Sequence, residues 1–125
     1  MPQEPSTSGR AVRRFRDPAY QPLCESLGDI RANIDRLDDA IVALLAERAM
    51  YVKDAARFKR DAFQVNAPAR QQEVFDKVRA LAALHNRGFE GLPEVVEAAY
   101  RALVAAFIAN EQRYFEQMES TGDIS

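Results

Sequence analysis

Five charged side chains interrupt helical faces that are otherwise apolar, and they are the residues best suited to chemistry in this chain. Arg48 and Lys59 fall on the apolar stripe of the first predicted helix, and Arg31 falls at the edge of that stripe. Arg70 continues the apolar line of a second predicted helix, and Glu111 lies on that of a third. An isolated charge is costly to bury, so the four cations predict a shared anionic ligand.

The spacing of the cations indicates how such a ligand would be held. Arg48 and Lys59 are 11 residues apart, about 16 Å along a helix, and their long side chains can lean together across a small dianion. Arg31 precedes Arg48 by 17 residues, about 25 Å along the helix, which is too far to share a ligand within one chain. An antiparallel partner helix could supply it, so the spacing favours a symmetric dimer. Glu111, in apolar surroundings, could donate a hydrogen bond as the neutral acid.

A structural interpretation competes with this one. Long cationic side chains often reach solvent from the edge of a stripe, and helical domains bury Arg–Glu pairs for structure alone. Any one of the five charges fits that interpretation, whereas all five together favour an anion pocket. The single Cys24 and the single His85 exclude a disulfide framework and a cysteine–histidine zinc site. Most serines lie in tail-like sequence, which argues against a serine nucleophile, so charge placement is the chemistry that remains.

Three helices, long, short and long, are predicted to position these residues in an all-α domain. The first starts between Leu23 and Asp29 and runs to about Lys59 or Arg60, and a short connection follows over 61–67. Pro68 fits the first turn of the second helix, which ends at an Asn-Arg-Gly turn at 86–88. The third helix runs from Pro93 to about Met118. The residues predicted to form the buried stripe of the first helix are Ile30, Ile34, Leu37, Ile41, Leu45, Val52 and Ala55.

Composition bounds the remaining functions. The chain is 47% hydrophobic and 29% charged with a formal net charge of −2, a globular balance that does not indicate binding to nucleic acid or to an anionic membrane. We divide it into a flexible extension over 1–22, a helical domain over 23–119 and a tail over 120–125. The extension holds four prolines and four arginines, which fits a solvated basic tail better than an organelle transit peptide. It lacks the apolar core of a secretion signal, so a cytoplasmic protein is expected.

The segment from Asp29 to Lys59 resembles the first helix of the all-helical chorismate mutase family. That family's pattern has an early Arg, an L-L-x-x-R segment 17 residues later and a Lys 11 residues after that. Arg31, Arg48 and Lys59 match both spacings, and the likeness extends over roughly residues 27–118. The Y-V-K-x-A-x-R-F-K ending of the segment and the A-P-x-R sequence that ends at Arg70 look most like the isochorismate-pyruvate lyase branch of this family.

This resemblance implies an intertwined homodimer of three-helix protomers, with a small-molecule substrate and with neither cofactor nor metal. Arg31 of a partner would join Arg48 in holding the carboxylates of the substrate. Lys59 would contact the ether oxygen at which the reacting bond breaks, and Arg70 would be a further anion contact. Glu111 falls where the family has Gln or Glu donating to the same oxygen. A glutamate must be protonated to donate, so activity favoured at lower pH is expected.

Two positions depart from the pattern of bacterial mutases. These enzymes usually place carboxylates near the substrate hydroxyl at positions that match Ala67 and Gln71, and Gln71 is expected to contact the substrate here. Phe107 stands where a small polar residue is common. The absent carboxylates suit the lyase, but chorismate mutase is the commoner activity of the fold and Glu111 is compatible with it. The resemblance therefore implies a chorismate mutase of aromatic amino acid biosynthesis first. An isochorismate-pyruvate lyase of salicylate biosynthesis is the alternative. From another class, a non-catalytic helical dimerisation or ligand-sensing module remains open, as does a structural coiled-coil adaptor.

Overall fold

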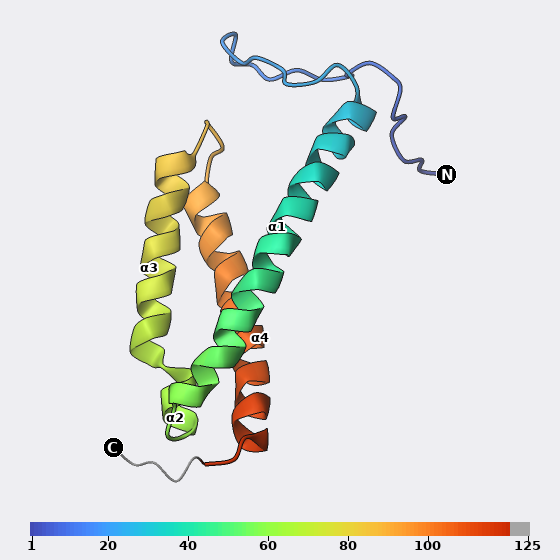
Figure 1. Cartoon of the computed structure of the whole chain (residues 1–125). Coiled ribbons are helices and arrows are strands. Elements are labelled where there is room, and N and C mark those ends of the chain that lie inside the picture. The colour runs from blue at the N-terminus through green and yellow to red at the C-terminus, as the bar shows by residue number, and fades with distance from the viewer. Residues whose placement is uncertain (121–125) are drawn as a thin grey trace. The chain divides into compact units, whose positions relative to one another are not determined.

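The computed structural model describes residues 1–120, in which every regular element is helical. The elements are α1 (Leu27–Ala55), a 3₁₀ turn (Ala56–Phe58), α2 (Ala62–Asn66), α3 (Pro68–His85) and α4 (Leu92–Gln117), as Figure 1 shows. The predicted all-α class with three main helices is confirmed. None of the helices in this described part is long and apolar enough to cross a membrane. The tail predicted over 120–125 lies, apart from Ser120, outside the described residues.

The chain divides into two compact units, one over residues 1–47 and one that begins at Arg48, and α1 runs across the boundary. In the first unit, residues 1–26 form no helix or strand. The backbone N–H of Gly28 donates to the carbonyl of Thr7 at 2.9 Å. The Ser26 hydroxyl accepts from the Asp29 N–H at 3.1 Å, so it satisfies one of the free amides at the start of α1.

The predicted burial of the α1 stripe is wrong for the chain taken by itself. None of the 29 residues of α1 is buried. The four apolar residues that begin the stripe are 41–52% exposed, and they are Ile30, Ile34, Leu37 and Ile41. The physical reason is that the first unit holds only non-helical chain besides α1, so no second helix of that unit covers the stripe.

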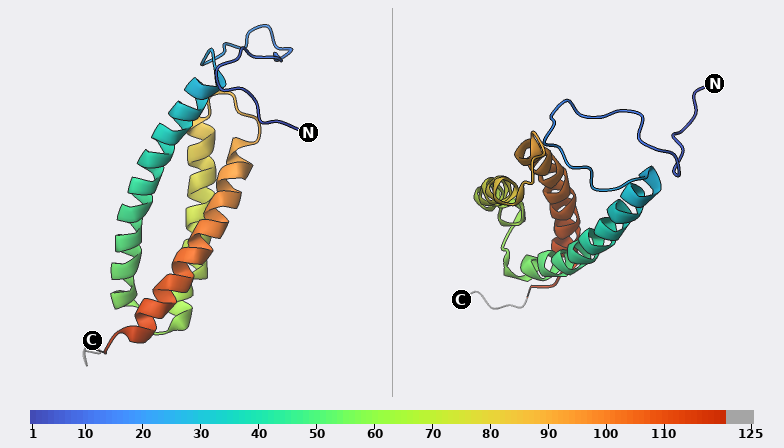
Figure 2. Two further views of the ribbon diagram at one scale, coloured as in Figure 1. Left: turned by 90° about the vertical axis from the view of Figure 1, so that its right-hand side faces the viewer. Right: turned by 90° about the horizontal axis from the view of Figure 1, so that it is seen from above.

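In the second unit, α3 packs along α4 as an antiparallel pair (Figures 1 and 2). Phe75 and Val78 of α3 and Val104 of α4 are buried in the core. Leu84, near the end of α3, is exposed. The predicted turn at 86–88 is present. There the Asn86 side chain accepts the backbone N–H groups of Gly88 and Phe89 at 3.2 and 2.8 Å.

A cluster of ion pairs ties α3 to α4 on the outside of this pair. Arg79 of α3 contacts Glu97 of α4 at 2.9 Å, and Arg101 contacts the same carboxylate at 2.7 Å. The Arg101 guanidinium also lies over the Phe75 ring, 4.4 Å from its centroid. Hydrogen bonds from Arg101 and then Arg79 hold the pKa of Glu97 below its ordinary value, because both favour the carboxylate form.

The prediction that the first helix continues to Lys59 or Arg60 is also wrong, by about one turn. α1 ends at Ala55, its last turn tightens into the 3₁₀ turn, and Lys59 is extended with φ −102° and ψ 142°. The predicted connection over 61–67 contains the short helix α2. Ala67 then joins α2 to α3 in a left-handed conformation, with φ 45° and ψ 61°. α3 starts at Pro68, as predicted, because proline has no N–H to leave unpaired there.

Candidate active site

A cavity of about 310 Å³ lies within the second unit, between the end of α1, the α2 segment, the start of α3 and the C-terminal half of α4. Five of the six predicted site residues line it, namely Arg48, Lys59, Arg70, Gln71 and Glu111. Valine, alanine and isoleucine side chains make up much of the remaining wall. A cavity of this size with a few converging polar groups is typical of a small-molecule site.

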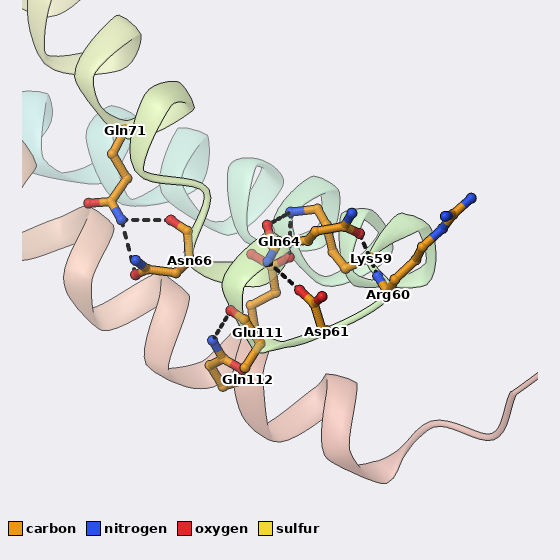
Figure 3. Close-up of polar contacts among 9 residues, drawn as sticks. Lys59, Arg60, Asp61, Gln64, Asn66, Gln71, Glu111 and Gln112 are labelled. Carbon is orange, nitrogen blue, oxygen red and sulfur yellow. Dashed lines mark hydrogen bonds and ion pairs between the residues drawn. The ribbon is translucent and has the colours of Figure 1, made fainter.

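Lys59 and Glu111 meet directly inside this cavity. The Lys59 Nζ lies 3.1 Å from Glu111 Oε2 and 3.3 Å from the backbone carbonyl oxygen of Gln64, to both of which it donates (Figure 3). Glu111 is only 5% exposed, so its charge is removed from water and the ammonium compensates it. Lys59 reaches the cavity from extended backbone beyond the 3₁₀ turn, not from the helical stripe on which it was predicted.

Arg48 is held by rings instead of a carboxylate. Its guanidinium lies 5.1 Å from the centroid of the Phe107 ring and 5.9 Å from that of Tyr100, both on α4. Within residues 1–120, Arg48 forms no ion pair. Aromatic faces attract a guanidinium but leave its charge uncompensated. Arg48 is therefore oriented by α4 and free to bind an anion.

Arg70 and Gln71 occupy the first turns of α3. Arg70 lines the cavity, but its side chain is 68% exposed and lies 3.8 Å from Glu73, so it is a rim residue and not the inward cation predicted. The reason is that a long side chain on the first turn of a helix can extend past the helix end into water. The Gln71 amide donates to the backbone and side-chain oxygens of Asn66 at 2.6 and 3.2 Å, which fastens α3 to the end of α2.

Arg31 is the predicted site residue that does not line this cavity. It lies in the first turns of α1, in the unit over residues 1–47, and it is exposed. Within residues 1–120, no carboxylate forms an ion pair with it. Its predicted role at the site of a partner copy therefore stays a prediction.

Sequence reasoning missed three groups that shape the cavity. The carbonyl of Gln64 accepts a hydrogen bond from Lys59, and Asn66 lines the wall of the cavity. The ring of Tyr100 forms a cation–π contact with the Arg48 guanidinium. A capping signal at Asp61 and Gln64 could have indicated α2, since a carboxylate followed three residues later by Gln is typical of a helix start. The carbonyl contact itself depends on tertiary placement and has no signal in the sequence.

The cavity can thus offer an anion an oriented, uncompensated guanidinium and, beside it, a lysine–glutamate pair that can donate hydrogen bonds. Neither serine, threonine nor cysteine is among its lining residues. Such a site suits a reaction that proceeds by binding, orientation and electrostatic stabilisation.

The sequence matches one family model and is similar to several known proteins. Residues 30–112, which include all six predicted site residues, match the family model described as chorismate mutase type II. A chorismate mutase of Methanocaldococcus jannaschii is 37% identical over 65 residues, which cover 51% of this chain and 66% of that protein. An isochorismate pyruvate lyase of Pseudomonas aeruginosa is 36% identical over 94 residues, or 75% of this chain and 89% of that protein. A bifunctional chorismate mutase/prephenate dehydratase of Aquifex aeolicus is 30% identical over 92 residues, but only 25% of that protein is covered.

Proposed function

The chain belongs to the chorismate mutase type II family of enzymes, and from that premise we propose that it rearranges chorismate to prephenate in the cavity between α1 and α4. The observation that carries the proposal is the Lys59–Glu111 pair beside the Arg48 guanidinium, with which no carboxylate of residues 1–120 forms an ion pair. This reaction is pericyclic. The ether C–O bond breaks as a C–C bond forms, with neither a covalent intermediate nor a transferred proton.

Arg48 would bind one carboxylate of the substrate. Its guanidinium presents a planar set of donors that matches a carboxylate, and the rings of Phe107 and Tyr100 limit its freedom before the ligand arrives. Gln71 and Arg70 would contact the substrate from the start of α3, Arg70 as an additional cation at the rim. Holding the enolpyruvyl group over the ring lowers the entropy cost of reaching the transition state.

Lys59 would donate to the ether oxygen, where negative charge develops as the C–O bond breaks. Its position is fixed before the reaction by Glu111 and the Gln64 carbonyl, so little reorganisation is needed. Glu111 would donate to the same oxygen when protonated.

The proposal includes a homodimer in which each site receives Arg31 from the other copy. The exposed apolar stripe at the start of α1 supports it, since four large aliphatic side chains 41–52% exposed are a surface that a second helix would cover. Arg31 lies beside that stripe and forms no ion pair within residues 1–120, so a partner helix that covers the stripe could bring this guanidinium to the other copy's site.

Cleavage of isochorismate to salicylate and pyruvate is the second candidate. Its support is that the lyase match covers 89% of that relative, and that Ala67 and Gln71 provide no carboxylate for the substrate hydroxyl. That reaction is also pericyclic and would use the same cationic side chains to hold the substrate. A helical module that binds the dianion without turnover is the candidate from another class.

The test is to incubate the purified protein with chorismate and with isochorismate, and to identify prephenate or salicylate. Arg48→Ala should lower kcat/KM by about 10²- to 10³-fold, the usual effect of removing a preorganised charged donor, while the far-UV circular dichroism is retained. Arg87→Ala, in the exposed turn between α3 and α4, is the matched control and should retain full activity. Binding of either compound without product would favour the sensing module, and loss of helicity in Arg48→Ala would favour the adaptor.

A further inference from the structure

The short helix α2 cannot be stable by itself. It spans five residues, whereas isolated helices shorter than about 12 residues are marginal in water. Locally, the Asp61 carboxylate accepts the Gln64 N–H at 2.9 Å, and the Gln64 side-chain carbonyl accepts the Arg60 N–H at 2.6 Å. These bonds define the ends of α2 but do not attach it to the rest of the unit, so its position must depend on contacts with other elements.

Gln112 of α4 supplies a polar attachment. Its Nε2 donates to the backbone carbonyl of Ala62, the first residue of α2, at 3.0 Å across 50 residues of sequence (Figure 3). Val65 on the same helix is 1% exposed, so apolar packing, this hydrogen bond and the bonds from Gln71 to Asn66 together hold α2 in place. Gln112 follows Glu111 directly in the chain, so one turn of α4 both anchors α2 and pairs with Lys59.

The position of α2 matters because of the Gln64 carbonyl. That oxygen lies on α2 and accepts from the Lys59 ammonium at 3.3 Å, while Glu111 on α4 holds it at 3.1 Å. The ammonium is thus fixed from two elements, and it can bond both acceptors at once only while α2 keeps its place against α4. We propose that Gln112 is a positioning residue, whose hydrogen bond to Ala62 keeps α2 in place and thereby aims Lys59 into the cavity. The catalytic consequence rests on the proposed function.

The experiment compares Gln112→Met with two other variants. Methionine preserves the length of the side chain and removes the donor. Gln72→Met is the matched control, because the Gln72 amide bonds Asp76 one turn away on the exposed side of α3, outside the cavity. Gln112→Lys restores a donor on a side chain one bond longer, adds a fourth lysine signal, and serves as the rescue.

Three readouts are compared in these full-length variants. Steady-state kinetics on chorismate separates kcat from KM. Backbone hydrogen exchange reports the opening of residues 62–67. Nuclear magnetic resonance of ¹³C-lysine reports the surroundings of the Lys59 side chain, and the chain has only three lysines to assign, Lys53, Lys59 and Lys77.

We expect Gln112→Met to lower kcat about fivefold, the effect of one lost hydrogen bond, with KM changed less than about twofold. Exchange at 62–67 should accelerate, the Lys59 signals should move toward those of the other lysines, and Gln112→Lys should reverse all three effects. Gln72→Met should match the wild type.

The proposal is overturned if Gln112→Met and Gln72→Met give the same kcat, or if the Lys59 signals and the exchange at 62–67 do not change. An equal loss of kcat in Gln112→Met and Gln112→Lys, with unchanged lysine signals, would also overturn it. Should the wild type turn over neither chorismate nor isochorismate, the proposed function fails. Exchange and lysine signals would then still decide whether Gln112 positions α2 and Lys59.

Discussion

The Lys59–Glu111 pair should show a large coupling in a double-mutant cycle on the free energy of unfolding. Glu111 is 5% exposed, so Lys59→Met leaves a buried carboxylate without its cation, at a cost of about 3 kcal/mol. Glu111→Met leaves an ammonium whose side chain is 22% exposed and still bonds the Gln64 carbonyl, so we expect a cost of about 1 kcal/mol. Removing both charges replaces the pair by apolar groups and should also cost about 1 kcal/mol, which leaves a coupling of about 3 kcal/mol.

The assay is urea unfolding followed by circular dichroism, with all four proteins at one concentration because association would stabilise the folded state. The matched control is a cycle on Arg57 and Asp54. The charged atoms of these residues lie 3.0 Å apart, against 3.1 Å for Lys59 and Glu111, but both side chains are more than 60% exposed. Their coupling should therefore be at most about 0.5 kcal/mol. Equal couplings in the two cycles, or an additive Lys59 and Glu111 pair, would show that burial does not govern this interaction and would refute the reasoning.

Four further predictions follow from the same contacts. Glu111→Gln should retain turnover of chorismate, because an amide donates a hydrogen bond to the ether oxygen without first binding a proton, and a variant that forms no prephenate would contradict this. Equal amounts of Arg31→Ala and Arg48→Ala, each inactive alone, should recover about a quarter of wild-type activity after mixed refolding, because half of the dimers carry one intact site; no recovery would argue against sharing. Glu97 has a lowered pKa, so its carboxylate stabilises the fold above the unfolded value of 4.5 and this contribution disappears as the pH falls through the folded value. The thermal midpoint of the wild type should therefore fall more between about pH 5 and 3 than that of Glu97→Gln. If the midpoints of the two proteins fell equally with pH, the ion pairs of Glu97 would not stabilise the fold. Ala67→Gly should raise the free energy of unfolding by up to about 1 kcal/mol, since glycine adopts φ 45° without strain, and a decrease in urea unfolding would contradict it.

The long helices could be predicted because their signals are repeated many times along the chain. A period near 3.6 residues and the breaks at 61–67 and 86–93 define them, and Pro68 marks the start of α3 within a residue. The shorter elements could not, since five residues of α2 and three of the 3₁₀ turn are too few for a periodic pattern. Their formation depends on bonds from other segments, such as that from Gln112 to Ala62.

The candidate site was partly visible in the sequence for a related reason. A charged residue on an apolar helical face is easy to recognise in a sequence, and this pattern identified Arg48, Lys59 and Glu111. All three line one cavity. Which charges pair cannot be obtained in this way, because Lys59 and Glu111 are 52 residues apart and meet only after α4 folds back. The same limit applies to Arg70, whose position on the helical wheel is correct for the core but whose side chain ends in solvent.

The balance of charge in the cavity gives a physical argument for a second chain. A dianionic substrate needs about two uncompensated cations to offset the loss of its hydration. Glu111 already neutralises Lys59, and Glu73 lies beside the exposed guanidinium of Arg70, so Arg48 alone remains both oriented and uncompensated. One chain therefore provides about half of the positive charge that the proposed substrate requires. In the proposed dimer, the missing charge would come from an arginine that is exposed and outside any ion pair of residues 1–120, on an apolar surface that another helix would cover. Arg31 meets each of these conditions, so its transfer to the site would break no ion pair.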